Sequence, residues 1–391
     1  MRDTLAARSR MDAVQAPIIP IVGKLIRDVP GTISLGQGVV HYGPPPAALD
    51  AVRERLTDPL LHQYGPADGW PPLVERIARK LRDENGIQAG VGTAIMVTAG
   101  ANMAFMHAVF AVTRPGDEII LPVPFYFNHE MAIEMAGCRP VPVPTDSGHQ
   151  LDLQAIQTAI TPRTRAVVTV SPNNPSGAVF DPEALRALSS LCAARGLLHI
   201  SDETYEYFTY DGARHVSPAA FPGAADHTIA IYSLSKAFGF AGWRIGYMAY
   251  PARLSAAMTK SQDTILICPT LAAQVAAAAA LDVGRAYCEP HVRELGSIRD
   301  VVIGTLARLD PLVQVGAADG AFYCLLKVAT NQDPIALNER LIVEHKVAAI
   351  PGSAFGLTDG CYLRLAYGAL QKATVAEGVG RLVSGLRALC G

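Results

Sequence analysis

The most informative stretch of this chain is Ser233-Leu-Ser-Lys-Ala-Phe-Gly-Phe-Ala-Gly-Trp-Arg-Ile-Gly246. It follows residues 228–232, an apolar run that is typical of a buried strand. Lys236 therefore lies between a strand end and a glycine-rich loop, where desolvation disfavours its charge and leaves an amine that can condense with a carbonyl. Further along the loop, Arg244 offers donors that suit a phosphate oxyanion, and the two serines add hydroxyls.

The same segment closes a longer pattern of strands and helices over residues 94–250. Short β-rich runs alternate with loops that contain Gly, Pro or Asn, and with helical periods such as Asn102–Val112, Pro182–Arg195 and Ala252–Ser261. This alternation predicts a mostly parallel sheet that is sandwiched by helices. The expected strands are Ile95–Thr98, Glu118–Leu121, Pro140–Val143, Ala166–Val170, Leu197–Ser201, Thr228–Ser233 and Ile245–Tyr250.

The pattern changes on both sides of this α/β core. After residue 282, a long helix, an apolar run at Phe322–Val328, a helix from Pro334 to Glu344 and a closing helix predict a second, smaller α/β domain. Near the N-terminus, Pro17, Pro20 and Pro30 predict an extended arm along the surface. We therefore divide the chain into an N-terminal arm that joins the small domain (1–44), a large domain (45–282) and a small C-terminal domain (283–391).

The composition excludes several classes of protein. Half of the 391 residues are apolar and 17% are charged, which excludes a disordered or fibrous chain. The net charge is −2 and both signs are mixed along the sequence, so we expect no nucleic acid partner. The most apolar helical stretch, residues 271–281, is shorter than the ~20 residues that a bilayer requires, so we expect no membrane partner.

The cysteines indicate the compartment. Seven are scattered along the chain without a Cys-x-x-Cys pair, which is typical of free thiols in a reducing environment and argues against a metal site. The N-terminal arginines are not followed by the apolar run of a signal peptide. We therefore expect a cytoplasmic protein that holds no metal.

Polar residues follow four of the expected strands. They are Thr98-Ala-Gly-Ala-Asn102, Ser171-Pro-Asn-Asn-Pro-Ser-Gly177, Asp202-Glu-Thr-Tyr205 and Ser233-Leu-Ser-Lys236. Taken singly, each is compatible with a turn, a helix cap or a solvated lysine. Because ligands bind beyond the carboxyl ends of the strands in an open parallel sheet, the four together predict one binding site.

Together these residues resemble the class I/II aminotransferases, which are pyridoxal 5'-phosphate enzymes of fold type I. The resemblance covers nearly the whole chain and includes Leu35-Gly-Gln-Gly38, Tyr64, Asn174-Pro-Ser-Gly177, Pro351-Gly-Ser-Ala-Phe355 and Tyr362-Leu-Arg-Leu365. Within the family, Leu-Gly-Gln-Gly is most similar to the glutamine transaminase and kynurenine aminotransferase branch. Ser176 departs from the more usual threonine. The resemblance implies the fold type I architecture, with the cofactor bound by the large domain.

The resemblance also implies roles for the residues around the cofactor ring. Lys236 would bind the cofactor covalently and later shuttle a proton at the substrate Cα. Asp202 would pair with the pyridine nitrogen and keep the ring protonated, so that the ring accepts electrons. Asn174 and Tyr205 would hydrogen-bond the phenolic oxygen of the cofactor. Tyr126 would stack on the ring, with Phe125 as the second choice.

The cofactor phosphate would be held by residues from several loops. By resemblance these are Gly100, Ala101, Asn102, Ser233, Ser235 and Arg244, the first three at a helix N-terminus that favours an anion. Tyr64 resembles a tyrosine that reaches the phosphate of the neighbouring subunit. The resemblance therefore implies a homodimer.

Substrate binding would involve Arg364, which corresponds to the family arginine that grips the substrate α-carboxylate; the alternative is a strand arginine in a salt bridge. Gly38 would let the N-terminal arm approach the substrate, and Asn174 would contact it too. Residues 39–42 (Val39, Val40, His41 and Tyr42) either line the side-chain pocket or pack the arm. The stretch Ile265–Pro269 lacks the arginine that some dicarboxylate-specific relatives place there.

We therefore predict a homodimeric aminotransferase of amino acid metabolism that moves the amino group of an L-amino acid to a 2-oxo acid by a ping-pong mechanism. An apolar pocket wall formed by Val39, Val40, Tyr42 and residues 265–267 favours neutral or aromatic amino acids. The alternative is another reaction on the same fold: a carbon–sulfur lyase, a cyclopropane-forming synthase or a pyridoxal-phosphate-dependent oxidase. A sensor-type regulator or a pure binding protein is the alternative outside enzymes, and the retained Lys236 disfavours the latter.

Overall fold

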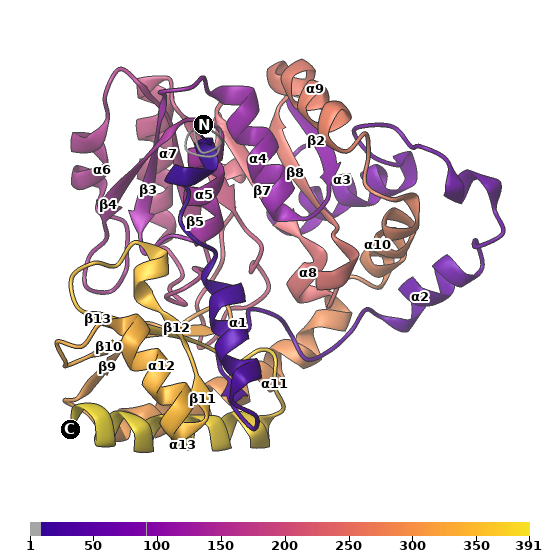
Figure 1. Cartoon of the computed structure of the whole chain (residues 1–391). Coiled ribbons are helices and arrows are strands. Elements are labelled where there is room, and N and C mark those ends of the chain that lie inside the picture. Colours follow the sequence, from indigo (N-terminus) through magenta and orange to yellow (C-terminus); the bar gives the residue numbers. More distant parts are fainter. Residues whose placement is uncertain (1–8, 91) are drawn as a thin grey trace, which may run out of the picture.

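A central sheet organises the fold of the computed structural model, which describes residues 9–90 and 92–391 (Figure 1). Within these residues its seven strands lie in the order β2-β8-β7-β6-β5-β3-β4. All pairs are parallel except those that β8 makes with β2 and β7. The strands are β2 (Thr93–Thr98), β3 (Glu118–Val123), β4 (Arg139–Pro144), β5 (Thr164–Val170), β6 (Leu198–Asp202), β7 (Thr228–Ser233) and β8 (Gly246–Pro251). The sequence-based strand prediction is confirmed to within two residues at each end.

Helices cover both faces of this sheet. On one face, Ile119 and Leu121 of β3 pack in a buried cluster with α4 (Ala101–Val112), α5 (Phe127–Met135) and α9 (Ser255–Ile265). On the other, Ile120 packs with α6 (Leu153–Ala159) and α7 (Pro182–Arg195). Successive residues of a strand point to opposite faces, so an apolar run throughout a strand serves both layers.

Local signals explain the helix bounds. The Asp181 carboxylate accepts hydrogen bonds from the backbone N–H groups of Glu183 and Ala184 at the start of α7, and Pro182 occupies the first helical position. Gly196 ends α7 in a left-handed conformation with φ 64°. The helix therefore has the bounds that the sequence predicted.

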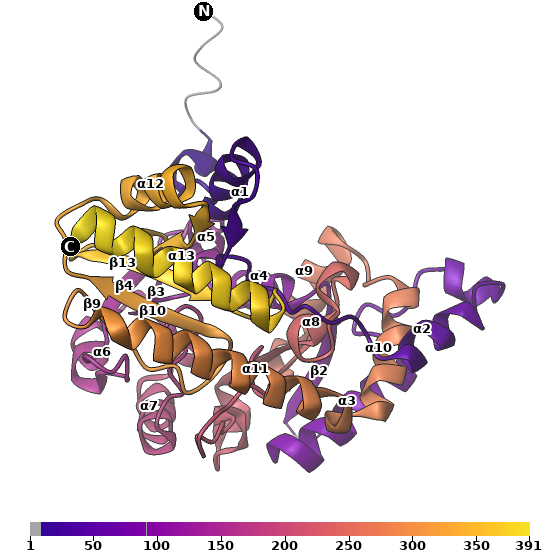
Figure 2. The ribbon, with the colours of Figure 1, turned by 90° about the horizontal axis from the view of Figure 1, so that it is seen from below.

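The second α/β unit surrounds a four-stranded antiparallel sheet of order β12-β13-β10-β9, of which Figure 2 labels β9, β10 and β13, together with the parallel pair β1-β11. These strands are β1 (Ile33–Ser34), β9 (Val313–Val315), β10 (Tyr323–Val328), β11 (Val347–Ala348), β12 (Ile350–Pro351) and β13 (Cys361–Ala366). The remaining helices are α1 (Ile18–Asp28), α2 (Pro46–Arg53), α3 (Pro71–Asn85), α8 (Leu234–Ala237), α10 (Leu271–Val283), α11 (Arg285–Leu306), α12 (Pro334–His345) and α13 (Lys372–Cys390). The division at residues 44 and 282 stays a prediction.

The prediction of an extended N-terminal arm is wrong for part of its length, because residues 18–28 form the helix α1. Pro17 lies at its N-cap and Pro20 in its first turn, where a missing N–H breaks no helical bond. Ile18 and Val22 are one helical turn apart and pack in a buried cluster with Ile342 of α12. Amphipathic packing therefore outweighs the prolines.

Three further findings concern the cysteines, membrane-spanning helices and metal clusters of the described residues. All seven cysteines lie in the described residues and are free thiols, as the sequence predicted. Within residues 9–90 and 92–391, no helix is long and apolar enough to cross a membrane. The same residues contain no cluster of three or more His, Cys, Asp or Glu side chains that could hold a metal ion.

Candidate active site

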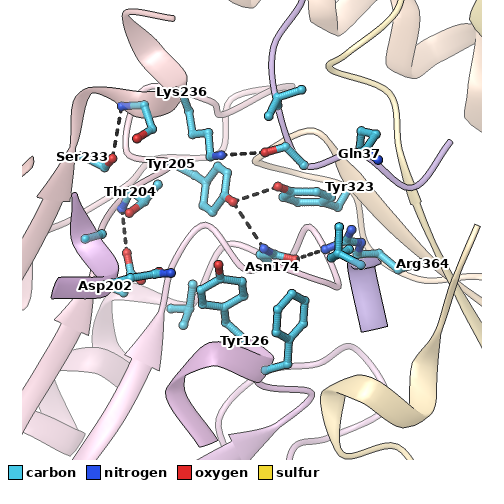
Figure 3. A pocket seen from close by; sticks show the side chains of 18 of the residues that line it. Gln37, Tyr126, Asn174, Asp202, Thr204, Tyr205, Ser233, Lys236, Tyr323 and Arg364 are labelled. Carbon is cyan, nitrogen blue, oxygen red and sulfur yellow. Dashed lines mark hydrogen bonds between the residues drawn. The ribbon is translucent and has the colours of Figure 1, made fainter. Parts of the chain in front are cut away.

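A cavity of about 270 Å³ lies at the carboxyl ends of β2, β5, β6 and β7 (Figure 3). The chain reverses direction at β8, so these four strands run the same way and end at one edge. The cavity is lined by Ile19, Gln37, Gly38, Val39, Ala101, Asn102, Tyr126, Phe127, Val170, Asn174, Asp202, Thr204, Tyr205, Ser233, Ser235, Lys236, Arg244, Tyr323 and Arg364. The predicted strand ends thus meet in one place.

Lys236 lies in the short helix α8, directly after β7. Its Nζ donates a hydrogen bond of 2.6 Å to the carbonyl of Gly38 in the N-terminal arm. The hydroxyl of Tyr42 donates to the carbonyl of Lys236 at 3.1 Å, so the arm holds this lysine by backbone and side chain. Burial, with the nearby charges of Arg244 and Arg364, lowers the pKa of Lys236 to about 8. The amine is therefore partly neutral near neutral pH.

Asp202 is the last residue of β6, and its carboxylate is buried. Oδ2 lies 3.1 Å from Nε2 of His129, and Oδ1 accepts a hydrogen bond of 3.0 Å from the backbone N–H of Thr204. Burial raises the pKa of Asp202, but these partners outweigh it and the net pKa is lowered. Phe105 stacks on the His129 ring at 4.1 Å and fixes its position.

A chain of hydrogen bonds runs along another wall of the cavity. Arg364 donates from Nη1 to Oδ1 of Asn174 at 2.9 Å and from Nη2 to the carbonyl of Gly36 at 2.7 Å. Asn174 donates from Nδ2 to the Tyr205 hydroxyl at 3.3 Å, which lies 2.8 Å from the Tyr323 hydroxyl. Burial raises the pKa of Tyr205 well above its ordinary value, so this hydroxyl stays protonated.

Arg364 is a buried cation whose charge and Nε donor have no partner among the described residues. Its side chain is packed between the rings of Tyr323 and Phe355, with centroids 4.8 and 5.0 Å from Cζ. It forms no salt bridge within the described residues, and its Nε has no hydrogen-bond partner there. The alternative of a strand arginine in a salt bridge is therefore wrong for this conformation.

The predicted phosphate residues gather at the N-terminus of α4. Ala101 and Asn102 begin this helix, and Gly100 precedes it with φ 78°. The positive φ favours glycine here, and a Cβ atom on Gly100 would lie 2.5 Å from Nη2 of Arg244, so that the guanidinium would have to shift. Ser233 and Ser235 line the same cavity as Ala101, Asn102 and Arg244. Backbone N–H groups, hydroxyls and a guanidinium thus form an anion cradle.

The charge of the cavity predicts an anionic ligand. Among the described residues that line it, Lys236, Arg244 and Arg364 are basic and Asp202 is the acidic side chain. With the lysine protonated, the balance is +3 − 1 = +2. Unmatched positive charge in a buried cavity favours a ligand with at least two negative charges.

Of the residues that the sequence predicted for ring stacking, the side-chain pocket and the partner's phosphate, some line this cavity and others do not. Tyr126 lines the cavity, whereas Phe125, the second choice, packs against Gly356. Val39 also lines it, but Val40, His41, Tyr42 and residues 265–267 do not, which corrects the predicted side-chain pocket for this chain. Tyr64 is 82% exposed and is absent from the cavity lining.

Sequence reasoning missed other residues. Gln37 lies within the Leu35–Gly38 segment of the arm, and Thr204 lies two residues after Asp202. Tyr323 and Phe127 enter because long-range packing places β10 and α5 beside the cavity. His129 does not line the cavity and touches it through Asp202. Ile19 was not predicted as a site residue, because the segment that contains it was expected to be extended and not helical.

Sequence comparison shows which known proteins this chain is similar to. The family model described as aminotransferase class I and II matches residues 30–382. The chain is 34% identical to an aromatic aminotransferase of Arabidopsis thaliana over 95% of this chain and 94% of the relative. It is also 34% identical to an aspartate aminotransferase of Pyrococcus abyssi, over 93% of this chain and 94% of that one.

Solved structures agree as well. An aromatic aminotransferase from Pyrococcus horikoshii superimposes with a TM-score of 0.87 at 34% identity, covering 94% of this chain and 99% of the other. The aspartate aminotransferase of Thermus thermophilus with maleate gives a TM-score of 0.88 at 30% identity, covering 96% and 98%. The similarity spans nearly the whole length of each protein.

Proposed function

This chain belongs to the class I and II aminotransferase family and is an aminotransferase, and from that premise we propose that it holds pyridoxal 5'-phosphate on Lys236 and transfers the amino group of a neutral or aromatic L-amino acid to a 2-oxo acid by a ping-pong mechanism. The single observation that carries the proposal is that Lys236 and Asp202 face one cavity whose charge balance is positive. Members of this family use pyridoxal phosphate.

The residues of the cavity fit this cofactor. The cradle of Gly100, Ala101 and Arg244 suits a phosphate, and the amine of Lys236 suits the aldehyde. The Asp202 carboxylate is buried next to His129, and an ionised carboxylate in this position suits a protonated ring nitrogen. A flat ligand between these groups also lies within reach of the Tyr126 ring.

When bound, pyridoxal phosphate supplies an electron-accepting ring to the substrate. The residues of the chain orient the cofactor, move the proton and bind the substrate. Asp202 holds the proton of the ring nitrogen, and Asn174 and Tyr205 donate toward the phenolic oxygen. Lys236, released from its covalent role, moves the proton at the substrate Cα, while the Gly38 carbonyl offers its amine an acceptor. Arg364, with a free Nε, binds the α-carboxylate.

The preferred substrate class follows from the rest of the wall. Ile19, Val39 and Phe127 are apolar, and each basic side chain that lines the cavity within the described residues already has a role in binding phosphate, aldehyde or α-carboxylate. An apolar or aromatic side chain would gain roughly 1–3 kcal/mol there. A second substrate carboxylate would lose its hydration without a partner. The names of the relatives include both aromatic and aspartate aminotransferases, so the wall carries this part of the proposal.

A homodimer is the proposed assembly. Large exposed apolar side chains gather on the segment that follows α2 and on the end of α9, namely Leu56, Leu60, Tyr64, Ile265 and Leu266. The N–H of Gly65 donates to Sγ of Cys268 at 3.3 Å, which joins the two stretches. In Figure 1 the segment after α2 projects from the body of the molecule. A projecting apolar surface suits burial against a second copy, which would bring Tyr64 to the partner's phosphate. The free thiols support a cytoplasmic location.

A half-reaction tests the function. Adding one amino acid to the cofactor-loaded protein without a 2-oxo acid should consume the absorbance of the lysine-bound cofactor once per site. A 2-oxo acid should then restore it, because the amino group stays on the enzyme between the two steps. Continuous turnover of the amino acid without any 2-oxo acid would overturn the proposal in favour of a lyase or an oxidase.

A further inference from the structure

Two buried tyrosines from different parts of the fold meet at the cavity wall. Tyr205 follows β6 of the central sheet, and Tyr323 begins β10 of the antiparallel sheet. Their hydroxyl oxygens lie 2.8 Å apart (Figure 3), and their rings meet edge to face at 5.4 Å. Either hydroxyl could donate in this hydrogen bond. The direction matters, because each hydroxyl has a single proton.

The neighbouring residues set part of this direction. The guanidinium of Arg364 can only donate, so the atom of Asn174 that faces it at 2.9 Å is the amide oxygen. The amide nitrogen of Asn174 therefore faces Tyr205 and donates to its oxygen at 3.3 Å. Tyr205 thus receives one hydrogen bond before Tyr323 is considered, and it still has one acceptor lone pair and its own proton.

Tyr323 has fewer choices than Tyr205. Its side chain is fully buried, and Tyr205 is the only hydrogen-bond partner that the described residues offer to its hydroxyl. Both tyrosines line the cavity, but if Tyr205 donated to Tyr323, the Tyr323 proton would have no acceptor among the described residues, and an unpaired buried donor is costly. If Tyr323 donates instead, the Tyr205 oxygen accepts two hydrogen bonds, and its proton remains for a group in the cavity.

We propose that Tyr323 is a positioning residue that donates its hydroxyl proton to Tyr205 and thereby directs the Tyr205 proton toward the phenolic oxygen of the cofactor. This inference rests on the proposed function, which places that oxygen beside Asn174 and Tyr205. The donated bond also polarises the Tyr205 hydroxyl and makes it a stronger donor.

Packing holds Tyr323 in the orientation that this role needs. A Cβ atom on Gly38 would lie 2.8 Å from the Tyr323 hydroxyl oxygen, and one on Gly177 would lie 2.5 Å from the Tyr323 carbonyl. Two glycines that the sequence motifs contain therefore make room for this residue. The Arg364 guanidinium covers its ring. Tyr323 is confined from three sides, so its hydroxyl has little freedom to turn away from Tyr205.

The test is a spectroscopic pH titration of the cofactor-loaded Tyr323→Phe variant, which keeps the ring and its contact with Arg364. A hydrogen-bond donor withdraws negative charge from the phenolic oxygen. The oxygen then stabilises the proton of the neighbouring lysine–cofactor linkage less, so the pKa of that linkage is lower. Weakening Tyr205 as a donor should therefore raise the pH midpoint of the absorbance change. We expect a rise of roughly 0.3 to 0.6 pH unit, a fraction of what a hydrogen bond to a charged group contributes.

Two further variants show whether the effect passes through Tyr205. Tyr205→Phe should raise the midpoint more than Tyr323→Phe does, and adding Tyr323→Phe to it should change the midpoint by no more than about 0.1 unit. Tyr210→Phe is the matched control, because this buried hydroxyl donates to the Ala321 carbonyl at 2.7 Å, and Tyr210 is absent from the cavity lining. It should leave the midpoint unchanged while it loses a buried hydrogen bond.

The outcomes separate this inference from the proposed function. A wild-type protein that shows no titratable absorbance with pyridoxal phosphate would overturn the proposed function. A normal wild-type titration with an unchanged midpoint in Tyr323→Phe would overturn the inference alone. A lowered midpoint would also overturn it, because it would mean that Tyr205 donates to Tyr323 and that removing Tyr323 frees that proton for the cofactor.

Discussion

Nε2 of His129 lies 3.1 Å from Oδ2 of Asp202, and both side chains are almost fully buried. His129 is carried by α5 and Asp202 by β6, so the contact joins a covering helix to the sheet. Its effect is to lower the pKa of a carboxylate that burial alone would raise. Asp202 is therefore ionised in a place where an isolated carboxyl group would be neutral.

Replacing Asp202 should damage turnover far more than folding. In Asp202→Ala the ring nitrogen of the cofactor would lose its counter-charge, and kcat should fall by roughly three orders of magnitude or more. Thermal unfolding and bound cofactor should be measured beside kcat, with Asp146→Ala, a surface carboxylate, as the control. Near-normal turnover with cofactor still bound would remove Asp202 from the site.

Removing His129 should move the acid limb of the pH profile. His129→Phe keeps a ring for Phe105 to stack on but removes one of the partners that lower the pKa of Asp202, and leaves Thr204 and, in the loaded enzyme, the protonated ring nitrogen. The pKa of Asp202 should then rise, and because the ionised form exists only above that pKa, activity should be lost at a higher pH as the solution is acidified. We expect the acid limb of kcat to shift upward by roughly one unit. An unmoved acid limb would contradict the role of His129.

Lys236 should control how fast the cofactor is loaded. Its pKa is lowered to about 8, so the reactive neutral amine increases about tenfold between pH 7 and pH 9 and then levels off. An ordinary lysine, with a pKa of about 10.4, would continue to gain neutral amine above pH 9, and Nα-acetyl-lysine in solution is the control. The rate of covalent loading of the cofactor-free protein, followed by absorbance, measures this. Borohydride reduction and peptide mapping should then recover the pyridoxyl group on Lys236 and on no other lysine.

Tyr64 should act across a subunit boundary. Light scattering should give twice the 41.4 kDa of one chain or a multiple of it. The Tyr64→Ala and Lys236→Ala variants should each be weak, yet subunits mixed and re-paired at random should regain about a quarter of wild-type activity, because half of the dimers then contain one intact site. A mixture that performs no better than the average of its parents, or a fully active monomer, would place the whole phosphate site in one chain.

The sequence predicted the parts of this molecule that local chemistry fixes. The strand ends at Thr98, Asp202 and Ser233 could be found because each apolar run stops at a polar residue, and Lys236 and Arg244 because a glycine-rich loop surrounds them. Tyr323 and His129 could not be found this way, since their roles depend on contacts with residues 118 and 73 positions away.

The errors have physical causes too. Pro17, Pro20 and Pro30 predicted an extended arm, whereas proline is tolerated at the start and in the first turn of a helix, where Pro17 and Pro20 lie. Residues 265–267 were assigned to the pocket, but they lie on an exposed surface of the single chain, where only a second copy could bring them to a cavity. The apolar spacing of Ile18 and Val22 is a helical signal that the prolines obscured, whereas assembly with a second copy leaves no pattern in a short stretch of sequence.

The side-chain wall of the cavity should decide the ranking of substrates. In the proposed function Arg364 binds the α-carboxylate of any amino acid, so discrimination would come from Ile19, Val39 and Phe127, whose apolar side chains line the cavity. With one common 2-oxo acid as acceptor, kcat/KM for phenylalanine and methionine should exceed that for aspartate by roughly 10- to 100-fold. A ranking led by aspartate would show that a cation enters the cavity from outside this chain's lining, for example from the partner.

A charge placed on α1 tests the same wall from the other side. Ile19→Lys should raise kcat/KM for aspartate and lower it for phenylalanine, because the new ammonium would pair with the second carboxylate and remove apolar contact. Ile21→Lys is the matched control on the same helix, since Ile21 is 43% exposed and does not line the cavity. If both lysines change the two substrates equally, the effect comes from the general field of the added charge, and Ile19 does not contact the substrate side chain.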